Sequence, residues 1–375
     1  MKRIALIRNS YPYDVGGAEI FPLNMGKVIT NYGYFPIILS ANIKTLKMAK
    51  VAGLQIKKSP WWSFQNFSGI KVLLFPIYLI WVLFLVIWYF LFIFKNRIDI
   101  IHPQSRDDFI SATIAAKILS KKVIWTDHAD LKYIYANHET WYKNPVGKLV
   151  YLVSKLADNI TLVSKSEKAL IENRLGHKLP NKCQVIHNGV TDKAKNINKS
   201  YNKDINFVMT SRLVTAKGIG EAIQAYKILN QQDKAKLIIY GDGPESRLFN
   251  RLATDIKGIE MVGHIDKVTK ALMRADVFVH PSYHEGFSLS LIEATMCSLP
   301  IIACRVGGNP EIVKEGVNGL LIKEKDPGSL ANAMRYFIEN PDLIKSMGRK
   351  SRDIYLENFQ FNKIVKEKFL PLYEK

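Results

Sequence analysis

Short apolar stretches alternate with longer segments of mixed polarity along most of the chain. This pattern predicts alternating strands and helices, which is typical of doubly wound α/β folds with parallel sheets. In the first half, the expected strands are 2–8, 36–41, 98–103, 122–126, 159–163 and 184–187, and the expected helices are 18–31, 107–119 and 166–175. In the second half, the expected strands are 207–209, 236–240, 258–261, 276–280, 300–303 and 319–322, with helices between them.

A polar segment at 192–204 separates the two series of strands and helices. It is rich in lysine and asparagine and has no periodicity, so we interpret it as a linker between domains at 1–191 and 205–355. A chain of 375 residues is long enough for two such domains. Ligands of doubly wound folds bind beyond the carboxyl ends of the strands, so we expect the ligand in a central cleft that both domains face.

One segment of the first domain departs from this alternation. Residues 72–94 are uncharged and almost wholly apolar, and as a helix they would be about 34 Å long, close to a bilayer core of about 30 Å. The flanking segments 2–8 and 98–102 are both expected in one sheet, which places them on the same side of a membrane. We therefore expect a helix that re-enters or lies in one leaflet, with Pro76 able to bend it. The alternative is a wholly buried core helix, which its two tryptophans, two tyrosines and apolar residues on every face disfavour.

Charge adds a second signal for a membrane surface. The formal net charge is +20, and residues 20–98 contain nine basic residues but no aspartate or glutamate. Such asymmetry attracts either nucleic acid or anionic lipid. Because the apolar run and four aromatic residues at 61–67 lie in the same interval, we expect anionic lipid and no nucleic-acid partner. The three cysteines lack metal or redox spacing, which is typical of free thiols in a reducing compartment. Because residues 2–8 are expected to form a strand, we expect no cleavable signal peptide.

The segment 280–321 carries the most informative chemistry. Its sequence predicts strand, glycine loop, helix, short strand, glycine loop and helix, with Glu285 and Glu293 eight residues apart across the first junction of loop and helix. A helix N-terminus offers free N–H groups and a partial positive charge, which suit a diphosphate. A carboxylate on either side of that diphosphate can hold a sugar and a ribose. The segment therefore suggests a nucleotide-sugar site.

Other candidates follow predicted strands. Arg212 and Lys217 are two cations that can neutralise a leaving diphosphate, although a solvated basic loop is the alternative. Gly16 and Gly17 let the backbone approach a ligand before a helix, or form a plain turn. Gly241 belongs to a tight loop that we expect to shape the wall of the nucleotide pocket.

Histidines give weaker signals. His128 can hydrogen-bond a donor sugar, but a lone histidine is more often structural, and its neighbours Asp127 and Asp130 can equally be helix caps. His280 and His284 have the spacing of helical metal ligands. Pro281 and Ser282 would break that helix and no third ligand is evident in the sequence, so we expect no metal.

Taken together, these motifs resemble those of the retaining family 4 glycosyltransferases of the GT-B fold, over nearly the whole chain. The motifs that carry the resemblance are Gly16-Gly17-Ala18-Glu19, His128, Val185 to Val190, Ser211-Arg212-Leu213 with Lys217-Gly218, Gly241 to Glu245, Glu285-Gly286-Phe287 through Glu293, and Gly307 to Glu311. The resemblance implies two Rossmann-like domains and sugar transfer from a nucleotide donor with retained anomeric configuration. It implies no metal and no cofactor beyond the donor, for which a UDP-sugar is the expectation.

The resemblance also implies roles for single residues. Arg212 and Lys217 would bind the diphosphate, Glu285 the sugar hydroxyls and Glu293 the ribose, while His128 would lie beside the donor sugar. Other positions that the motifs place at the donor are Gly16, Gly17, Asn188, Gly241, Gly286, and the backbone N–H groups of Phe287, Ser288 and Leu289. In similar proteins the C-terminal segment, here 356–375 with a helix at 361–373, packs back on the first domain.

Two departures from the family pattern affect the interpretation. Ser288-Leu289-Ser290 replaces the more usual Gly-Leu-Pro or Gly-Leu-Val, and the apolar run replaces an amphipathic helix. The second departure suggests a lipid-linked glycan acceptor, such as one linked to undecaprenyl diphosphate at the cytoplasmic face of the cell membrane, in cell-surface polysaccharide synthesis. A nucleotide-sugar epimerase on the same two-domain plan and a non-catalytic membrane-bound scaffold are the alternatives.

Overall fold

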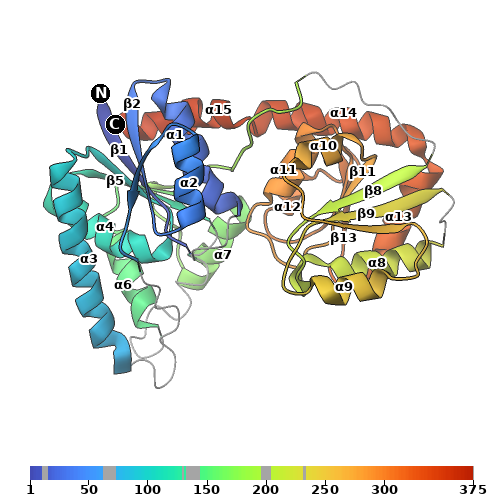
Figure 1. Cartoon of the computed structure of the whole chain (residues 1–375), viewed down its shortest axis with the longest axis horizontal. Coiled ribbons are helices and arrows are strands. Elements are labelled where there is room, and N and C mark those ends of the chain that lie inside the picture. Colours follow the sequence, from blue (N-terminus) through green and yellow to red (C-terminus); the bar gives the residue numbers. More distant parts are fainter. Residues whose placement is uncertain are drawn as a thin grey trace. The chain divides into compact units, whose positions relative to one another are not determined.

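The computed structural model describes residues 1–10, 16–61, 73–128, 131, 144–195, 204–230 and 234–374. Its contacts divide the chain into two compact units (Figure 1). Unit 1 comprises Met1–His187 together with Val365–Lys375, and unit 2 comprises Asn188–Ile364. Both units are parallel sheets with helices between the strands, as the alternation of apolar and polar segments predicts.

In the described part of unit 1, seven parallel strands form one sheet in the order β3-β2-β1-β4-β5-β6-β7. Ile4 in the third strand of this order pairs with Pro36 on one side and with Ile100 on the other. The strands are β1 (Lys2–Ile7), β2 (Tyr34–Ser40), β3 (Gln55–Lys58), β4 (Ile100–Pro103), β5 (Lys122–Asp127), β6 (Asn159–Leu162) and β7 (Cys183–Val185). The helices are α1 (Gly17–Thr30), α2 (Ile43–Val51), α3 (Phe75–Lys95), α4 (Arg106–Ile118), α6 (Pro145–Ser154) and α7 (Lys165–Leu175).

The apolar run forms α3, which packs along α4 at the outside of unit 1 (Figure 1). One face of α3 is buried in the core and carries Tyr78, Val82, Leu85, Tyr89, Phe92 and Ile93. The other face is exposed although it is equally apolar, with Ile80 at 70% and Leu83 at 60% exposure. A wholly buried core helix is therefore excluded. The predicted bend is also wrong, because Pro76 is in the first turn, where its missing N–H breaks no helical hydrogen bond.

Strands β1 and β4 confirm that both flanks of α3 belong to one sheet. They are parallel neighbours, with Leu6 opposite His102. Strand β3 precedes α3 and strand β4 follows it, and both strands belong to this sheet. Both ends of α3 therefore remain attached to the same folded unit.

In unit 2, the described strands form a six-stranded parallel sheet in the order β10-β9-β8-β11-β12-β13. The strands are β8 (Ile205–Thr210), β9 (Ala235–Tyr240), β10 (Ile259–Gly263), β11 (Val277–His280), β12 (Ile301–Cys304) and β13 (Gly319–Ile322). The helices are the short η2 (Thr215–Lys217), α8 (Ile219–Leu229), α9 (Ser246–Ala253), α10 (Val268–Met273), α11 (Leu289–Met296), α12 (Asn309–Ile312), α13 (Pro327–Glu339), α14 (Pro341–Asn358) and α15 (Phe361–Ile364).

The unit boundaries differ from the predicted domain boundaries. Residues 188–191 were assigned to the first domain, but Val190 exchanges backbone hydrogen bonds with Phe359 and Phe361 in unit 2. Asp192, which begins the predicted linker, forms an ion pair with Arg352 at 2.7 Å. These contacts hold the segment after β7 against the end of α14, so the first four residues of the expected linker, 192–195, belong to unit 2.

The C-terminal segment passes from unit 2 to unit 1 at Val365. The continuous helix expected at 361–373 is interrupted by a π-helical turn at Val365–Phe369, followed by α16 (Leu370–Glu374). Pro371 has no N–H to donate to the carbonyl of Glu367, which accounts for the widened turn. Tyr373 is buried in unit 1, where its carbonyl oxygen accepts a hydrogen bond from Lys2 near the other end of the chain (Figure 1).

Candidate functional site

Glu285 is the centre of a charged cluster in unit 2. Lys217 Nζ, at the end of η2, lies 2.6 Å from Glu285 Oε1, and His280 Nε2, at the end of β11, lies 2.9 Å from the same oxygen. Ser288 Oγ is 3.2 Å from that histidine nitrogen. Lys217 and His280 therefore both contact one carboxylate oxygen, Oε1, while Ser288 contacts the histidine. Oε2 makes no hydrogen bond with the described residues.

This environment keeps Glu285 ionised. Burial raises the pKa of its carboxyl group, but the hydrogen bond from His280 and the charges of His280 and Lys217 outweigh burial and lower the pKa to about 2. A fixed, ionised carboxylate is a strong hydrogen-bond acceptor. It can hold the hydroxyl groups of a bound ligand.

Helix α11 begins directly after this cluster. Ser288 is its N-cap residue, and the Ser288 hydroxyl accepts a hydrogen bond from the N–H of Leu291. Leu289 is the first residue of the helix, while Phe287 is buried with its ring edge against Phe359, at 5.8 Å between centroids. Gly286 accepts a hydrogen bond from the N–H of Gly308, which ties the loop after β12 to the cluster.

Glycines allow the loops at the carboxyl ends of the strands to touch each other's backbone. A Cβ atom on Gly241 would lie 1.8 Å from the carbonyl oxygen of Ser211, and one on Gly307 would lie 1.8 Å from that of Glu285. Gly218 has a φ of +71°, and its Cβ would lie 2.2 Å from the carbonyl oxygen of Pro281. The position of the charged cluster therefore depends on residues without side chains.

The other predicted residues of unit 2 differ in their burial and in whether they contact this cluster. Arg212 is exposed in the loop after β8, whereas Lys217 contacts Glu285 directly. Glu293 is on α11, where burial raises its pKa and the charge of Lys193 partly offsets that rise. Asn188 precedes Gly189, whose missing side chain admits the carbonyl of Phe359.

His280 is a candidate site residue that was not predicted from the sequence. It was considered only as a metal ligand, but in the structure it orients Glu285. Its position at the end of a buried strand, five residues before a loop carboxylate, is the signal that could have identified it. Within the described ranges, no group of three or more His, Cys, Asp and Glu side chains is arranged to hold a metal ion.

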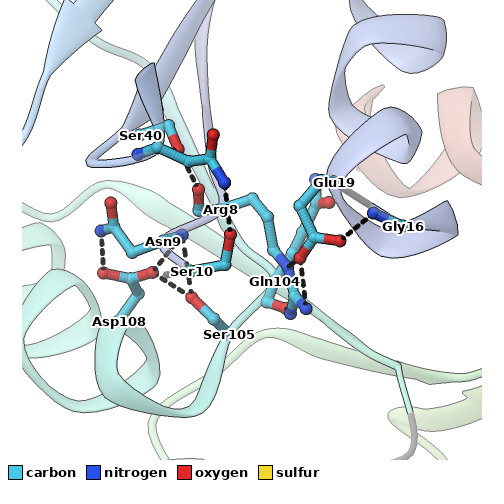
Figure 2. Close-up of polar contacts among 10 residues, drawn as sticks. Arg8, Asn9, Ser10, Gly16, Glu19, Ser40, Gln104, Ser105 and Asp108 are labelled. Carbon is cyan, nitrogen blue, oxygen red and sulfur yellow. Dashed lines mark hydrogen bonds and ion pairs between the residues drawn. The ribbon is translucent and has the colours of Figure 1, made fainter. Parts of the chain in front are cut away.

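Unit 1 has its own polar network at the carboxyl end of β1 (Figure 2). Arg8 forms an ion pair with Glu19 at 3.0 Å, and Glu19 accepts a hydrogen bond of 2.9 Å from the N–H of Gly16. This second contact closes the N-terminus of α1, which begins at Gly17. Arg8 Nη1 also donates to the carbonyl oxygen of Gln104 at 2.6 Å, so the arginine joins β1, α1 and the end of β4.

A buried carboxylate organises the same end of the sheet. Asp108 accepts hydrogen bonds from the side chain of Asn9 at 2.7 Å and from the hydroxyl of Ser105 (Figure 2). It also accepts a hydrogen bond from the hydroxyl of Tyr89 at 2.8 Å. Burial raises the pKa of Asp108, and these hydrogen bonds partly offset the rise. The Asn9 side chain also accepts from the N–H of Ala41, so the residues after β1, β2 and β4 form one network.

His128 follows β5 in the same unit. Its ring edge packs against Phe21 at 5.1 Å between centroids, and its buried Nε2 has no hydrogen-bond partner in the described ranges. Burial, then the charges of Arg8 and His102, lower its pKa well below the usual value, so the imidazole is neutral near pH 7. The neighbouring Asp127 accepts from the N–H of Leu131, as expected of a cap, while Asp130 lies outside the described residues.

Comparisons with known proteins agree with this architecture. Two family models match the chain, Glycosyltransferase Family 4 over residues 15–193 and Glycosyl transferases group 1 over residues 190–354. The chain is 29% identical to an uncharacterized glycosyltransferase of Methanocaldococcus jannaschii, over 73% of this chain and 75% of the relative. It is also 29% identical to N-acetyl-alpha-D-glucosaminyl L-malate synthase of Bacillus anthracis, over 73% of this chain and 74% of that enzyme.

The fold is shared with solved GT-B structures. HepE of Anabaena, solved in complex with UDP, matches with a TM-score of 0.79 at 18% identity, and the match covers 100% of both chains. Together the two family models extend from residue 15 to residue 354, across both sheets described above. The chain belongs to the glycosyltransferases of family 4, also termed group 1, and has their GT-B fold.

Proposed function

We propose that this glycosyltransferase moves a sugar from a nucleoside diphosphate sugar to a hydroxyl group of an acceptor. The observation that carries the proposal is the cluster at the end of β11, where Lys217 and His280 hold Glu285 ionised before the start of α11. The carboxylate suits sugar hydroxyls, and the N–H groups at a helix start suit phosphate. HepE was solved with UDP and with UDP-glucose, which supports a UDP-sugar as the donor here.

In this proposal the donor phosphate is both leaving group and base. It stays near the anomeric carbon, takes the proton of the acceptor hydroxyl as the glycosidic bond breaks, and so retains the anomeric configuration without a nucleophile from the protein. Arg212 and Lys217 balance the charge on the leaving diphosphate, so no metal ion is required. The ammonium group of Lys217 has three N–H donors and can contact Glu285 and a phosphate together. Glu293 binds the ribose, and His128 binds the sugar.

Replacing Arg212 tests this proposal. Arg212→Ala should lower kcat by about 100-fold, corresponding to roughly 3 kcal/mol of lost transition-state stabilisation. Arg251→Ala, on the exposed side of α9, is the matched control and should keep normal turnover. The assay follows release of the nucleoside diphosphate from a panel of UDP-, GDP- and ADP-sugars. Near-normal turnover of the Arg212 variant would contradict the proposal.

The same assay separates the proposal from the two alternatives. A transferase releases the nucleoside diphosphate when a lipid-linked acceptor is present. A nucleotide-sugar epimerase would convert the donor without an acceptor, and a non-catalytic scaffold would bind no donor in calorimetry.

We also propose that α3 holds the protein on the cytoplasmic face of the membrane, where a lipid-linked glycan is the acceptor for cell-surface polysaccharide. The support is the exposed apolar face of α3, with the exposed Lys95 and Arg97 at its end. Apolar side chains enter the acyl region of a leaflet while basic groups meet anionic headgroups. Because the opposite face of α3 packs on α4, the proposal is a helix lying in the membrane surface rather than a free crossing.

Flotation with anionic liposomes tests the role of α3. A variant with glutamine at Ile80, Leu83 and Ile87, all on the exposed face, should stay with the soluble fraction. The control replaces the similarly exposed Leu248 and Leu252 of α9 with glutamine and should still float. Equal flotation of both variants would remove α3 as the membrane contact.

A further inference from the structure

Gln104 is an unusual buried residue in unit 1. Its exposed fraction is 0%, yet neither the nitrogen nor the oxygen of its side-chain amide has a hydrogen-bond partner among the residues that the structure describes. Buried polar groups are nearly always paired, because an unpaired group loses its hydrogen bonds to water without replacement. An amide that keeps both groups unpaired in the folded protein therefore needs an explanation other than stability.

The backbone of Gln104 is held firmly, so its position is not the result of a loose loop. The N–H of Gln104 donates to the carbonyl oxygen of Ile7 at 2.9 Å, and its own carbonyl accepts from Arg8 at 2.6 Å (Figure 2). Gln104 follows β4, which pairs with β1 on one side and with β5 on the other. It is thus at the carboxyl edge of the sheet, where doubly wound folds bind their ligands.

A second unpaired polar group lies at the same edge. His128 follows β5, and its buried Nε2 has no hydrogen-bond partner within the described part of the chain. The neighbouring charge is already balanced, because Arg8 is paired with Glu19. A neutral imidazole and a neutral amide beside a neutralised arginine favour an uncharged ligand that offers both hydrogen-bond donors and acceptors. Sugar hydroxyl groups have both properties.

We propose that Gln104 is a sugar-binding residue that hydrogen-bonds ring hydroxyl groups with both ends of its amide. This inference rests on the proposed glycosyltransferase function and extends it to a residue outside the family motifs described above. The sugar comes either from the donor or from the acceptor, since both present the same hydroxyl groups.

Gln104→Met tests the inference, because methionine has a similar shape and makes no comparable hydrogen bonds. Removing two unpaired polar groups should raise the melting temperature of the ligand-free protein. The same change should lower kcat/KM at least tenfold, because the bound sugar loses its partners. If the sugar is the donor's, calorimetric affinity for the donor and its slow hydrolysis without acceptor should both fall. If it is the acceptor's, these two should be unchanged and the acceptor KM should rise.

Thr45→Val is the matched control. Thr45 on α2 is also buried in unit 1, and its hydroxyl also lacks a hydrogen-bond partner among the described residues. This variant should gain stability as Gln104→Met does, but should keep normal kcat/KM.

Two results would overturn the inference. A lower melting temperature of Gln104→Met would mean that the amide is bonded within the folded protein. Unchanged kcat/KM and unchanged sugar binding would mean that it does not contact substrate, while the proposed function would still stand. If the wild type binds a nucleotide sugar but transfers nothing, the proposed function fails, and calorimetry on Gln104→Met still decides the inference. If the wild type binds no nucleotide sugar or glycan at all, both fail.

Discussion

At the scale of single residues, burial sets the charge of the histidines in unit 1. Both ring nitrogens of His102 are hydrogen-bonded inside the protein, Nδ1 with Tyr373 and Nε2 with Thr126, each at 2.7 Å. Burial lowers the pKa of His102 to about 3. His102 is therefore a neutral structural residue that links β4, β5 and the C-terminal segment, whereas the unpaired His128 is the candidate for substrate binding.

We expect the titration of His102 to lower the free energy of unfolding as the pH falls. The unfolded chain binds a proton at this residue below pH 6.5, whereas the folded chain binds it only near pH 3. Falling pH between these values favours unfolding, by about 2 kcal/mol at roughly pH 5. Urea unfolding at about pH 7.5 and pH 5 measures the effect. Between these two pH values, the free energy of unfolding of His102→Gln, which cannot titrate, should fall by about 2 kcal/mol less than that of the wild type. An equal fall in both proteins would show that His102 is not the cause.

A second prediction at this scale compares Gly218 with Gly316. Both have a φ of +71°, but Gly316 has open space around it. Alanine at either position should cost about 1 to 2 kcal/mol for the left-handed backbone. Only Gly218→Ala also places a Cβ atom 2.2 Å from the carbonyl oxygen of Pro281, which must displace Lys217 or the loop before Glu285. Gly218→Ala should therefore be the less stable variant and lose donor affinity. Equal stability and equal affinity in the two variants would show that the close approach is unimportant.

At the scale of secondary structure, α3 joins the outer surface of unit 1 to its polar network. Its exposed face is apolar, but its buried face supplies the hydroxyl of Tyr89 to Asp108. Asp108 in turn binds Asn9, directly after β1. The helix that we propose to contact lipid therefore also supports Asn9 at the carboxyl end of β1.

Removing the Tyr89 hydroxyl should weaken this connection. Tyr89→Phe leaves Asp108 buried with one hydrogen bond fewer, and the expected loss of unfolding free energy is about 1 to 3 kcal/mol. Tyr336→Phe on α13 is the control, because Tyr336 is exposed and should change stability little. Denaturant unfolding of the two variants gives the comparison. Similar values for both would show that the bond to Asp108 contributes nothing to stability.

The sequence predicted elements where periodicity or a buried apolar run was present. All twelve predicted strands have counterparts within a few residues, because the strands of a parallel sheet are buried on both faces and stand out as apolar. Helices α2 and α6 and strand β3 were missed. Residues 43–58 contain five lysines, and β3 is an exposed edge strand whose sequence, QIKK, has no apolar run to reveal it.

At the scale of the whole molecule, residues close in the chain were easier to predict than residues that the fold brings together. Glu285, Lys217 and the glycine loops follow predicted strands, so a site at one sheet edge could be expected from the sequence. The network of Asn9, Tyr89 and Asp108 depends on strand order and helix packing, which a single sequence does not encode locally. The unpaired amide of Gln104 likewise becomes visible only once its burial is known.

The C-terminal segment should stabilise unit 1 and not unit 2, and the distribution of tryptophan makes this measurable. All six tryptophans lie between residues 61 and 141, so tryptophan fluorescence reports on unit 1 alone, whereas far-UV circular dichroism reports on both units. Phe369 is buried in unit 1 against Phe21 and His102, and Phe369→Ala should cost about 3 to 5 kcal/mol and shift the fluorescence transition. Phe337→Ala removes an equally buried ring from unit 2 and should shift only the circular dichroism transition. If Phe337→Ala shifts the fluorescence transition as far as Phe369→Ala does, the two units unfold together. The stabilising effect of the C-terminal segment then cannot be assigned to unit 1 alone.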